Sequence, residues 1–200
     1  MNYKKDEASS RQPDVQTVAM RNGKTVKRVY FNQTEREEID EAGEGEEPRQ
    51  RTVYVADYIE LETDETDARA IARQFMQQAI NDYDTSEAVN QFNFNVEASG
   101  ITIPYWLSVE KRTQIRESVT AWNSAKKGAY KLDVREYDLS PDIDCAKLIA
   151  MLQELEVYAI KCYNITSSHL RAIDDLTMSV EEILNYDFTA GYPEKLTFTI

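Results

Sequence analysis

The sequence has two cysteines and one histidine, and this scarcity narrows the chemistry open to it. Cys145 and Cys162 fall on one predicted helix, about 25 Å apart at a rise of 1.5 Å per residue, so they cannot form a disulfide with each other. Two free thiols are typical of a protein made in a reducing cytosol. A zinc site needs clustered ligands, and His169 has no second histidine to join it. We therefore expect no bound metal and no other cofactor.

Glycine and long apolar runs are also scarce. The six glycines are scattered, so the sequence contains no glycine-rich phosphate loop, and no Gly-x-Ser-x-Gly elbow is present. No apolar run approaches the roughly 20 residues that span a bilayer. The polar N-terminus lacks the apolar core of a secretory signal. These absences predict a protein that neither spans a membrane nor carries a recognisable nucleotide site.

Basic residues are outnumbered, with 23 Lys and Arg against 36 Asp and Glu and a formal net charge of −13. Nucleic-acid binding depends on cationic groups that release counterions, so this balance argues against a nucleic-acid partner. It argues equally against binding to an anionic lipid surface. We expect the partners to be other proteins.

The candidates for catalysis have simpler structural explanations. His169 is expected near the start of a helix, where a surface or packing role explains it better than general acid–base chemistry. Cys145 lies near a helix N-terminus, which can lower a thiol pKa, but no partner base is in view. Asp142 and Asp144 are better explained as capping residues than as an acid–base pair. We predict that the chain is not an enzyme and assign no catalytic residue.

The first fifty residues predict an arm. Val15–Arg21 and Lys24–Phe31 are β-capable runs separated by Asn22-Gly23, the strongest hairpin signal in the sequence. Residues 35–50 are acidic and contain glycine and proline, which indicates a flexible linker. A lone hairpin is marginal in water, so it should dock on the core, a second copy or a partner. The candidate contact residues of this hairpin are Val15, Val18, Val26, Val29 and Tyr30.

Residues 51–200 predict one α+β core domain, with a small antiparallel sheet and helices packed on one face. The longest apolar stripe runs from Asp144 to Leu176 and predicts two helices joined by a corner at residues 164–166. Ser108 and Ser179 are expected to cap two further helices. Strands are expected at residues 52–61, 91–96, 101–107, 129–137 and 196–200.

Aromatic residues outside these stripes are the remaining interface candidates. Tyrosine combines a large apolar body with a polar tip, which suits a wet protein interface and equally suits the end of a core. Both interpretations stay open on sequence alone. The residues concerned are Tyr105, Trp106, Tyr186, Phe188 and Tyr192.

Two motifs carry a resemblance to a known family. They are Leu155–Thr166, followed by His169, and the segment Tyr186–Leu196, with the helix Arg112–Val119 upstream. Together they resemble an uncharacterised domain family carried by tailed phages and prophages, notably of gut bacteria. The resemblance covers roughly residues 66–196.

The resemblance implies a role in the phage particle. Members of that family lie among tail genes and bring no known active site. The expected function is that of a non-enzymatic virion structural protein, tail- or baseplate-associated, made in the bacterial host cytoplasm and present in several copies. The alternative is a tail-fibre assembly chaperone that is absent from the finished virion.

Overall fold

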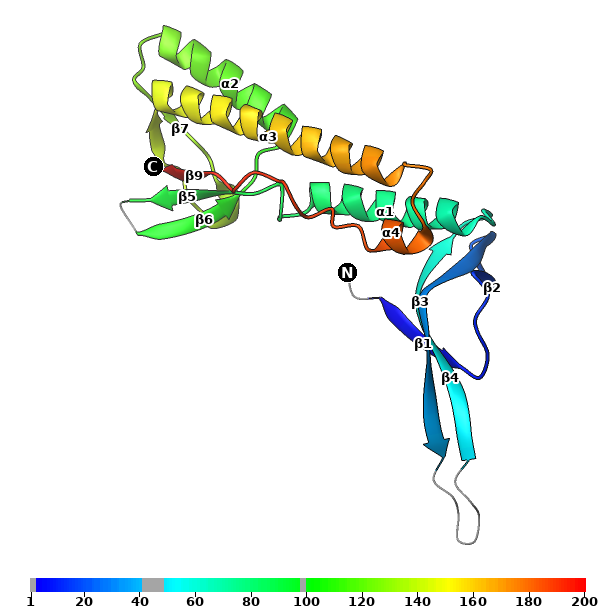
Figure 1. The fold of residues 1–200 in the computed structure, drawn as a ribbon. Helices are drawn as coiled ribbons and strands as arrows, with labels where there is room; N and C mark the ends of the chain where they lie inside the picture. The colour runs from blue at the N-terminus through cyan, green and yellow to red at the C-terminus, as the bar shows by residue number, and fades with distance from the viewer. Residues whose placement is uncertain (1–2, 41–48, 98–99) are drawn as a thin grey trace. The chain divides into compact units, whose positions relative to one another are not determined.

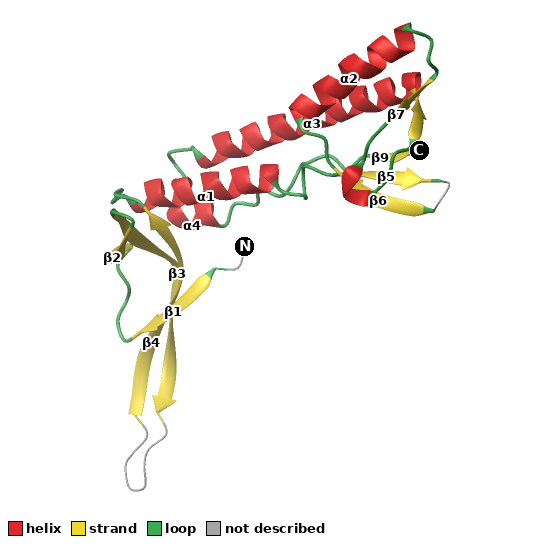
Figure 2. Cartoon of the chain, turned by 180° about the vertical axis from the view of Figure 1, so that it is seen from behind, coloured by secondary structure: helices red, strands yellow, loops and turns green. Residues whose placement is uncertain are grey.

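The computed structural model describes residues 3–40, 49–97 and 100–200. Within them the fold class is α+β, as the sequence predicts, with four α-helices and three sheets (Figure 1). The sheets have four, three and two strands. The β-structure is therefore more divided than the single small sheet expected from the sequence (Figure 2).

The chain divides into two compact units, which are described separately. Unit 1 comprises Met1–Ile80 and His169–Phe188, and unit 2 comprises Asn81–Ser168 and Thr189–Ile200. None of the three boundaries, at residues 80/81, 168/169 and 188/189, falls at the predicted division between residues 50 and 51. The reason is that strands from both sides of that position pair in one sheet.

The sheet of unit 1 is antiparallel, with strand order β1-β4-β3-β2. The predicted hairpin is confirmed, because β2 and β3 pair around Asn22 and Gly23, whose φ angles are 52° and 75°. A two-residue turn with two positive φ angles follows the twist of the strands it joins. The strands are β1 (Lys4–Ala8), β2 (Val15–Arg21), β3 (Lys24–Asp40) and β4 (Arg49–Glu62).

The prediction of a flexible linker at residues 35–50 is wrong for those of its residues that the structure describes. Residues 35–40 continue β3, and residues 49–50 open β4. Residues 41–48 lie outside the described residues. Composition suggested a solvated linker, whereas pairing places acidic residues opposite arginine, as at Glu38 and Arg51. Opposite charges across two antiparallel strands stabilise the pair.

Residues 68–80 of helix α1 (Ala68–Thr85) and helix α4 (Val180–Leu184) complete unit 1. The ring of Tyr3 contacts Phe31 of β3 edge-on at 4.8 Å between centroids, and Phe75 of α1 at 6.5 Å. The predicted capping box of α4 is confirmed by reciprocal bonds between Ser179 and Glu182. The fully buried residues of unit 1 include Val29, Phe31, Ile71, Ala72, Met76, Ile80, Ile173 and Ile183.

Unit 2 contains the other two sheets. The predicted second hairpin is confirmed as β5 (Phe92–Val96) and β6 (Ile101–Tyr105). β6 is an edge strand, which suits Pro104 because proline has no N–H to donate. The terminal strand β9 (Thr197–Thr199) pairs parallel to β5. The strand predicted at residues 129–137 is shorter than expected: only β7 (Ala129–Lys131) is a strand, and it pairs with the short strand β8 (Asp142–Asp144). The rest of the predicted strand is a loop with a short 3-10 helix, η1 (Arg135–Tyr137).

Helix α3 (Cys145–Ile173) is one continuous helix of 29 residues, so the predicted corner at residues 164–166 is wrong. Thr166 does not cap a new helix; its hydroxyl donates to the Cys162 carbonyl 3.1 Å away, within the same helix. Asp144 caps α3 as predicted, accepting from the Lys147 N–H, and Ser108 caps α2 (Val109–Ser124). The unit 2 core includes Phe92, Phe94, Ile103, Val119, Leu132, Ile143, Leu148, Leu152, Leu155 and Tyr158.

Candidate interaction surfaces

The hairpin residues predicted to face a partner lie mostly inside unit 1. Val26, Val29 and Tyr30 are buried, so they hold the hairpin on its own sheet. The Tyr30 hydroxyl contacts Asp6 of β1 at 2.9 Å, and Arg28 stacks on the ring of Tyr58 at 4.1 Å. Val18 is half-buried, at a register shift between β2 and β3. The N-terminal hairpin is present as predicted, and β4 supplies the partner strand that this hairpin needs.

The predicted aromatic candidates also make contacts within the chain. Tyr105 and Trp106 are half-buried and pack against the unit 2 core. Phe188 is buried in unit 1, and the Tyr186 hydroxyl lies 2.8 Å from Nδ1 of His169. Tyr192 is half-buried and bonds to Thr166 at 2.8 Å. Of the two interpretations left open by the sequence, these contacts favour aromatic residues that close the ends of the cores.

A polar cluster in unit 2 binds three segments of the chain together. The Thr166 hydroxyl of α3 contacts Asp84 of α1 at 2.5 Å and the hydroxyl of Tyr192. The nearby Cys162 is buried, and burial raises the pKa of its thiol, which keeps it protonated and unreactive at neutral pH. The cluster therefore acts as a structural tie and supplies no activated nucleophile.

Arg112 is a buried charged residue of unit 2. It is 3% exposed, and its guanidinium donates to the Leu107 carbonyl at 2.6 Å and to Glu156 at 3.0 Å. The indole ring of Trp106 lies 5.4 Å from the guanidinium carbon. These contacts connect α2 to α3 and to the loop between β6 and α2. The guanidinium group is therefore engaged in contacts within unit 2.

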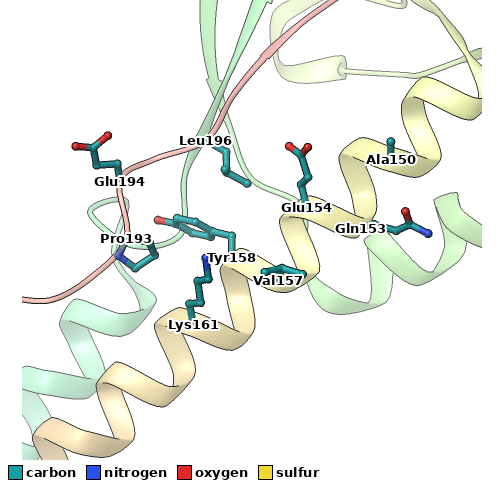
Figure 3. A pocket seen from close by; sticks show the side chains of 9 residues that line it. All are labelled: Ala150, Gln153, Glu154, Val157, Tyr158, Lys161, Pro193, Glu194 and Leu196. Carbon is teal, nitrogen blue, oxygen red and sulfur yellow. The ribbon is translucent and has the colours of Figure 1, made fainter.

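A groove of about 470 Å³ runs along α3 in unit 2 (Figure 3). Its wall on one side is the helix, and on the other the segment that carries Pro193 and Leu196. Val157, one of the residues that line it, is 53% exposed, and Glu154, Lys161 and Glu194 also line the groove. The groove is mainly apolar, and its polar side chains do not converge on one point (Figure 3).

The far end of the longest strand pair in unit 1 is largely exposed. We call residues 35–40 of β3 with residues 49–53 of β4 the distal ribbon. β1 pairs with β4 only as far as Tyr54, and β2 pairs with β3 only as far as Val29, so no third described strand flanks the distal ribbon. Figure 1 shows these strands continuing past the ends of β1 and β2. Ile39 is 67% exposed, and Val53 at the base is the only buried side chain among those described.

Ion pairs hold the distal ribbon together. Glu38 accepts from Arg51 across the strands at 2.8 Å and from Arg36 along its own strand at 2.7 Å. These two arginines, Arg51 first, hold the pKa of Glu38 below its ordinary value. The ribbon is therefore best stabilised above the ordinary carboxyl pKa, and this contribution is lost as the pH falls through the lowered pKa. Arg36 also reaches Glu7 of β1 at 3.0 Å.

Sequence reasoning missed the distal ribbon, although a signal for it exists. A run of acids at 35–40 is followed, after residues rich in turn formers, by Arg49 and Arg51. Such complementary runs are typical of two strands that pair across a connection. Among the described residues there is no cluster of three or more metal-ligating side chains and no helix long and apolar enough to cross a membrane. Comparisons with protein-family models, curated proteins and solved structures found no match.

Proposed function

We propose that this chain is a non-enzymatic structural protein of a phage virion, tail- or baseplate-associated, that acts by binding other virion proteins. The observation that carries the proposal is the distal ribbon. A two-stranded ribbon exposed on both faces is marginal in water, so a chain that keeps one gains stability when a neighbour covers it. The resemblance of residues 66–196 to a phage tail-gene family supports the tail or baseplate as the place of the chain in the virion.

The polar groups of the fold support the non-enzymatic part of the proposal. A catalytic centre usually shows polar groups held ready for a substrate and titratable groups perturbed toward a task. Every buried side-chain nitrogen and oxygen among the described residues has a hydrogen-bond partner within the chain. Arg112 and Thr166 are engaged in ties between secondary-structure elements.

The direct test is quantitative mass spectrometry of purified particles of the phage or prophage that encodes the chain. We expect peptides from this chain at a constant ratio to known tail proteins, through every step of particle purification. An unrelated cytoplasmic host protein provides the background level. A chain that falls to this background during purification would contradict the proposal.

The same samples separate the structural role from the chaperone alternative. A chaperone would co-purify with tail-fibre protein from the lysate and be absent from the finished particle. The net charge of −13 suits a soluble assembly factor as well as a virion component. The observation that favours the structural role is the extended distal ribbon, which provides a long contact edge for a permanent neighbour.

A further inference from the structure

We propose that the distal ribbon binds the distal ribbon of a second copy of this chain, with the outer edge of β3 in one copy against the outer edge of β4 in the next. This inference names the partner of the surface on which the proposed function rests. It concerns contacts between copies, so purified protein can test it without particles.

The first argument is the backbone at the two edges. In a β-strand, alternate residues direct their backbone N–H and C=O groups away from the paired strand. Along residues 35–40 of β3 and 49–53 of β4, no further described strand lies beside those outward groups. An exposed strand edge is a template for another strand. The distal ribbon therefore offers two such templates, one on each side.

The second argument is that the two edges carry opposite charge. Residues 35–40 of β3 contain four carboxylates and one arginine, whereas residues 49–53 of β4 contain two arginines and no acidic residue. Pairing β3 with β3, or β4 with β4, would place like charges side by side, which is destabilising. Pairing β3 of one copy with β4 of the next places opposite charges side by side. Charge complementarity thus selects one arrangement of copies over the two symmetric ones.

The geometry of the strands agrees with this arrangement. Within a copy, β3 and β4 run antiparallel. If the ribbon is repeated side by side, β4 of one copy also lies antiparallel to β3 of the next, so the distal ribbons can form a continuous antiparallel sheet without reversing any copy. At the base of the ribbon the same two edges are already paired with β1 and β2. Such a head-to-tail contact differs from a two-fold dimer because each copy uses two different surfaces. It builds a ring when the rotation closes and a filament when it does not.

The net charge of −13 per chain opposes association, but this repulsion acts over longer distances than the contact between two strand edges. Neighbouring strands lie about 4.8 Å apart, which is inside the Debye length of about 8 Å at physiological ionic strength. Charges that lie more than a Debye length apart are screened more strongly. At physiological ionic strength the attraction between the two strand edges is therefore screened less than the repulsion due to the net charge.

The test uses two charge-reversed variants of the full chain and their mixture. The first is Glu35→Lys with Glu37→Lys, which makes both edges basic, and the second is Arg49→Glu with Gln50→Glu, which makes both edges acidic. Both variants keep the Glu38–Arg51 ion pair that holds the ribbon. The matched control reverses two exposed acids away from the ribbon, Glu87→Lys with Glu117→Lys. Circular dichroism and thermal melts check that every variant is folded.

Sedimentation velocity at about 0.15 M salt measures association. We expect the wild-type chain and the control to associate, and each ribbon variant alone to associate at least about tenfold more weakly. An equimolar mixture of the two variants should recover wild-type association, because every basic edge then meets an acidic edge. Recovery on mixing is not expected from a general effect of net charge.

The inference would be overturned by a wild-type chain that stays monomeric, by ribbon variants that associate like wild type, or by a mixture that fails to recover association. A control variant that loses association as strongly as the ribbon variants would do the same. None of these results bears on whether the chain is present in particles. Conversely, absence from particles together with recovery on mixing would remove the virion role and leave the edge contact standing.

Discussion

Leu155→Asp is expected to abolish the cooperative folding of unit 2. Leu155 is 1% exposed and belongs to the core between α3 and the strands. The substitution removes a buried leucine side chain and places a carboxylate in an apolar core. Each effect costs several kcal/mol on its own. We expect a loss of about 4 kcal/mol or more in the free energy of unfolding, measured by urea denaturation followed by circular dichroism.

Val157→Asp is the matched control on the same helix. Val157 lies two residues further along α3 and is 53% exposed, so its carboxylate stays in water. Valine and aspartate have similar helix propensities, so the expected change is within about 0.5 kcal/mol. If Leu155→Asp melted like Val157→Asp, the assignment of the buried face of α3 would be wrong.

Arg112→Ala is expected to have the second-largest effect. The substitution removes the donor to the buried Leu107 carbonyl, the partner of Glu156 and the cation beside Trp106. Breaking a buried pair by removing one member costs about 3–5 kcal/mol, because the other member is left uncompensated. Glu156 is partly exposed, so water relieves some of this cost. We therefore expect a destabilisation of about 2–3 kcal/mol, measured by the same denaturation.

Glu156→Gln separates the two sides of this ion pair. Glutamine keeps an oxygen that can accept from the Arg112 Nε–H while removing the charge. Because the Glu156 side chain is partly exposed, we expect the free energy of unfolding to fall by about 1 kcal/mol or less. Equal effects of Arg112→Ala and Glu156→Gln would show that the ion pair, and not the bond to the Leu107 carbonyl, holds α2 in place.

Local signals in the sequence predicted much of the fold. The turn at Asn22-Gly23, the caps at Ser108 and Asp144 and the capping box at Ser179 are confirmed. Each depends on residues within a few positions of one another, so the pattern contains the cause. Pro104 belongs to the same group, since the missing N–H alone restricts it to an edge.

The corner expected in α3 could not be excluded from the sequence. Thr166 is a plausible helix cap, and only its contacts with Asp84 and Tyr192 show that its hydroxyl is engaged elsewhere. Those residues lie more than twenty positions away, so local pattern cannot reveal them. The sequence predicts an interface role for the buried hairpin residues Val26 and Val29 for a similar reason, because the strand that pairs with them begins only at Arg49.

The distal ribbon is the part of the candidate surface that composition concealed. Its residues are polar because both faces meet solvent, and a polar segment with no apolar alternation resembles a linker. What makes it a ribbon is the match between the acids of β3 and the arginines of β4. Its structure follows from long-range pairing, which a residue-by-residue assessment does not include.

The central claim is that the chain functions by being held in a particle through its distal ribbon. The most direct measurement is incorporation of a ribbon-shortened chain, in which an Asn-Gly turn joins Thr34 directly to Val55, its register partner in β4. Particles are purified from cells that express either this chain or the full chain, and the amount bound is quantified by mass spectrometry. We predict a shortened chain that melts cooperatively like the full chain and is absent from particles. A shortened chain that enters particles as efficiently as the full chain would contradict the account.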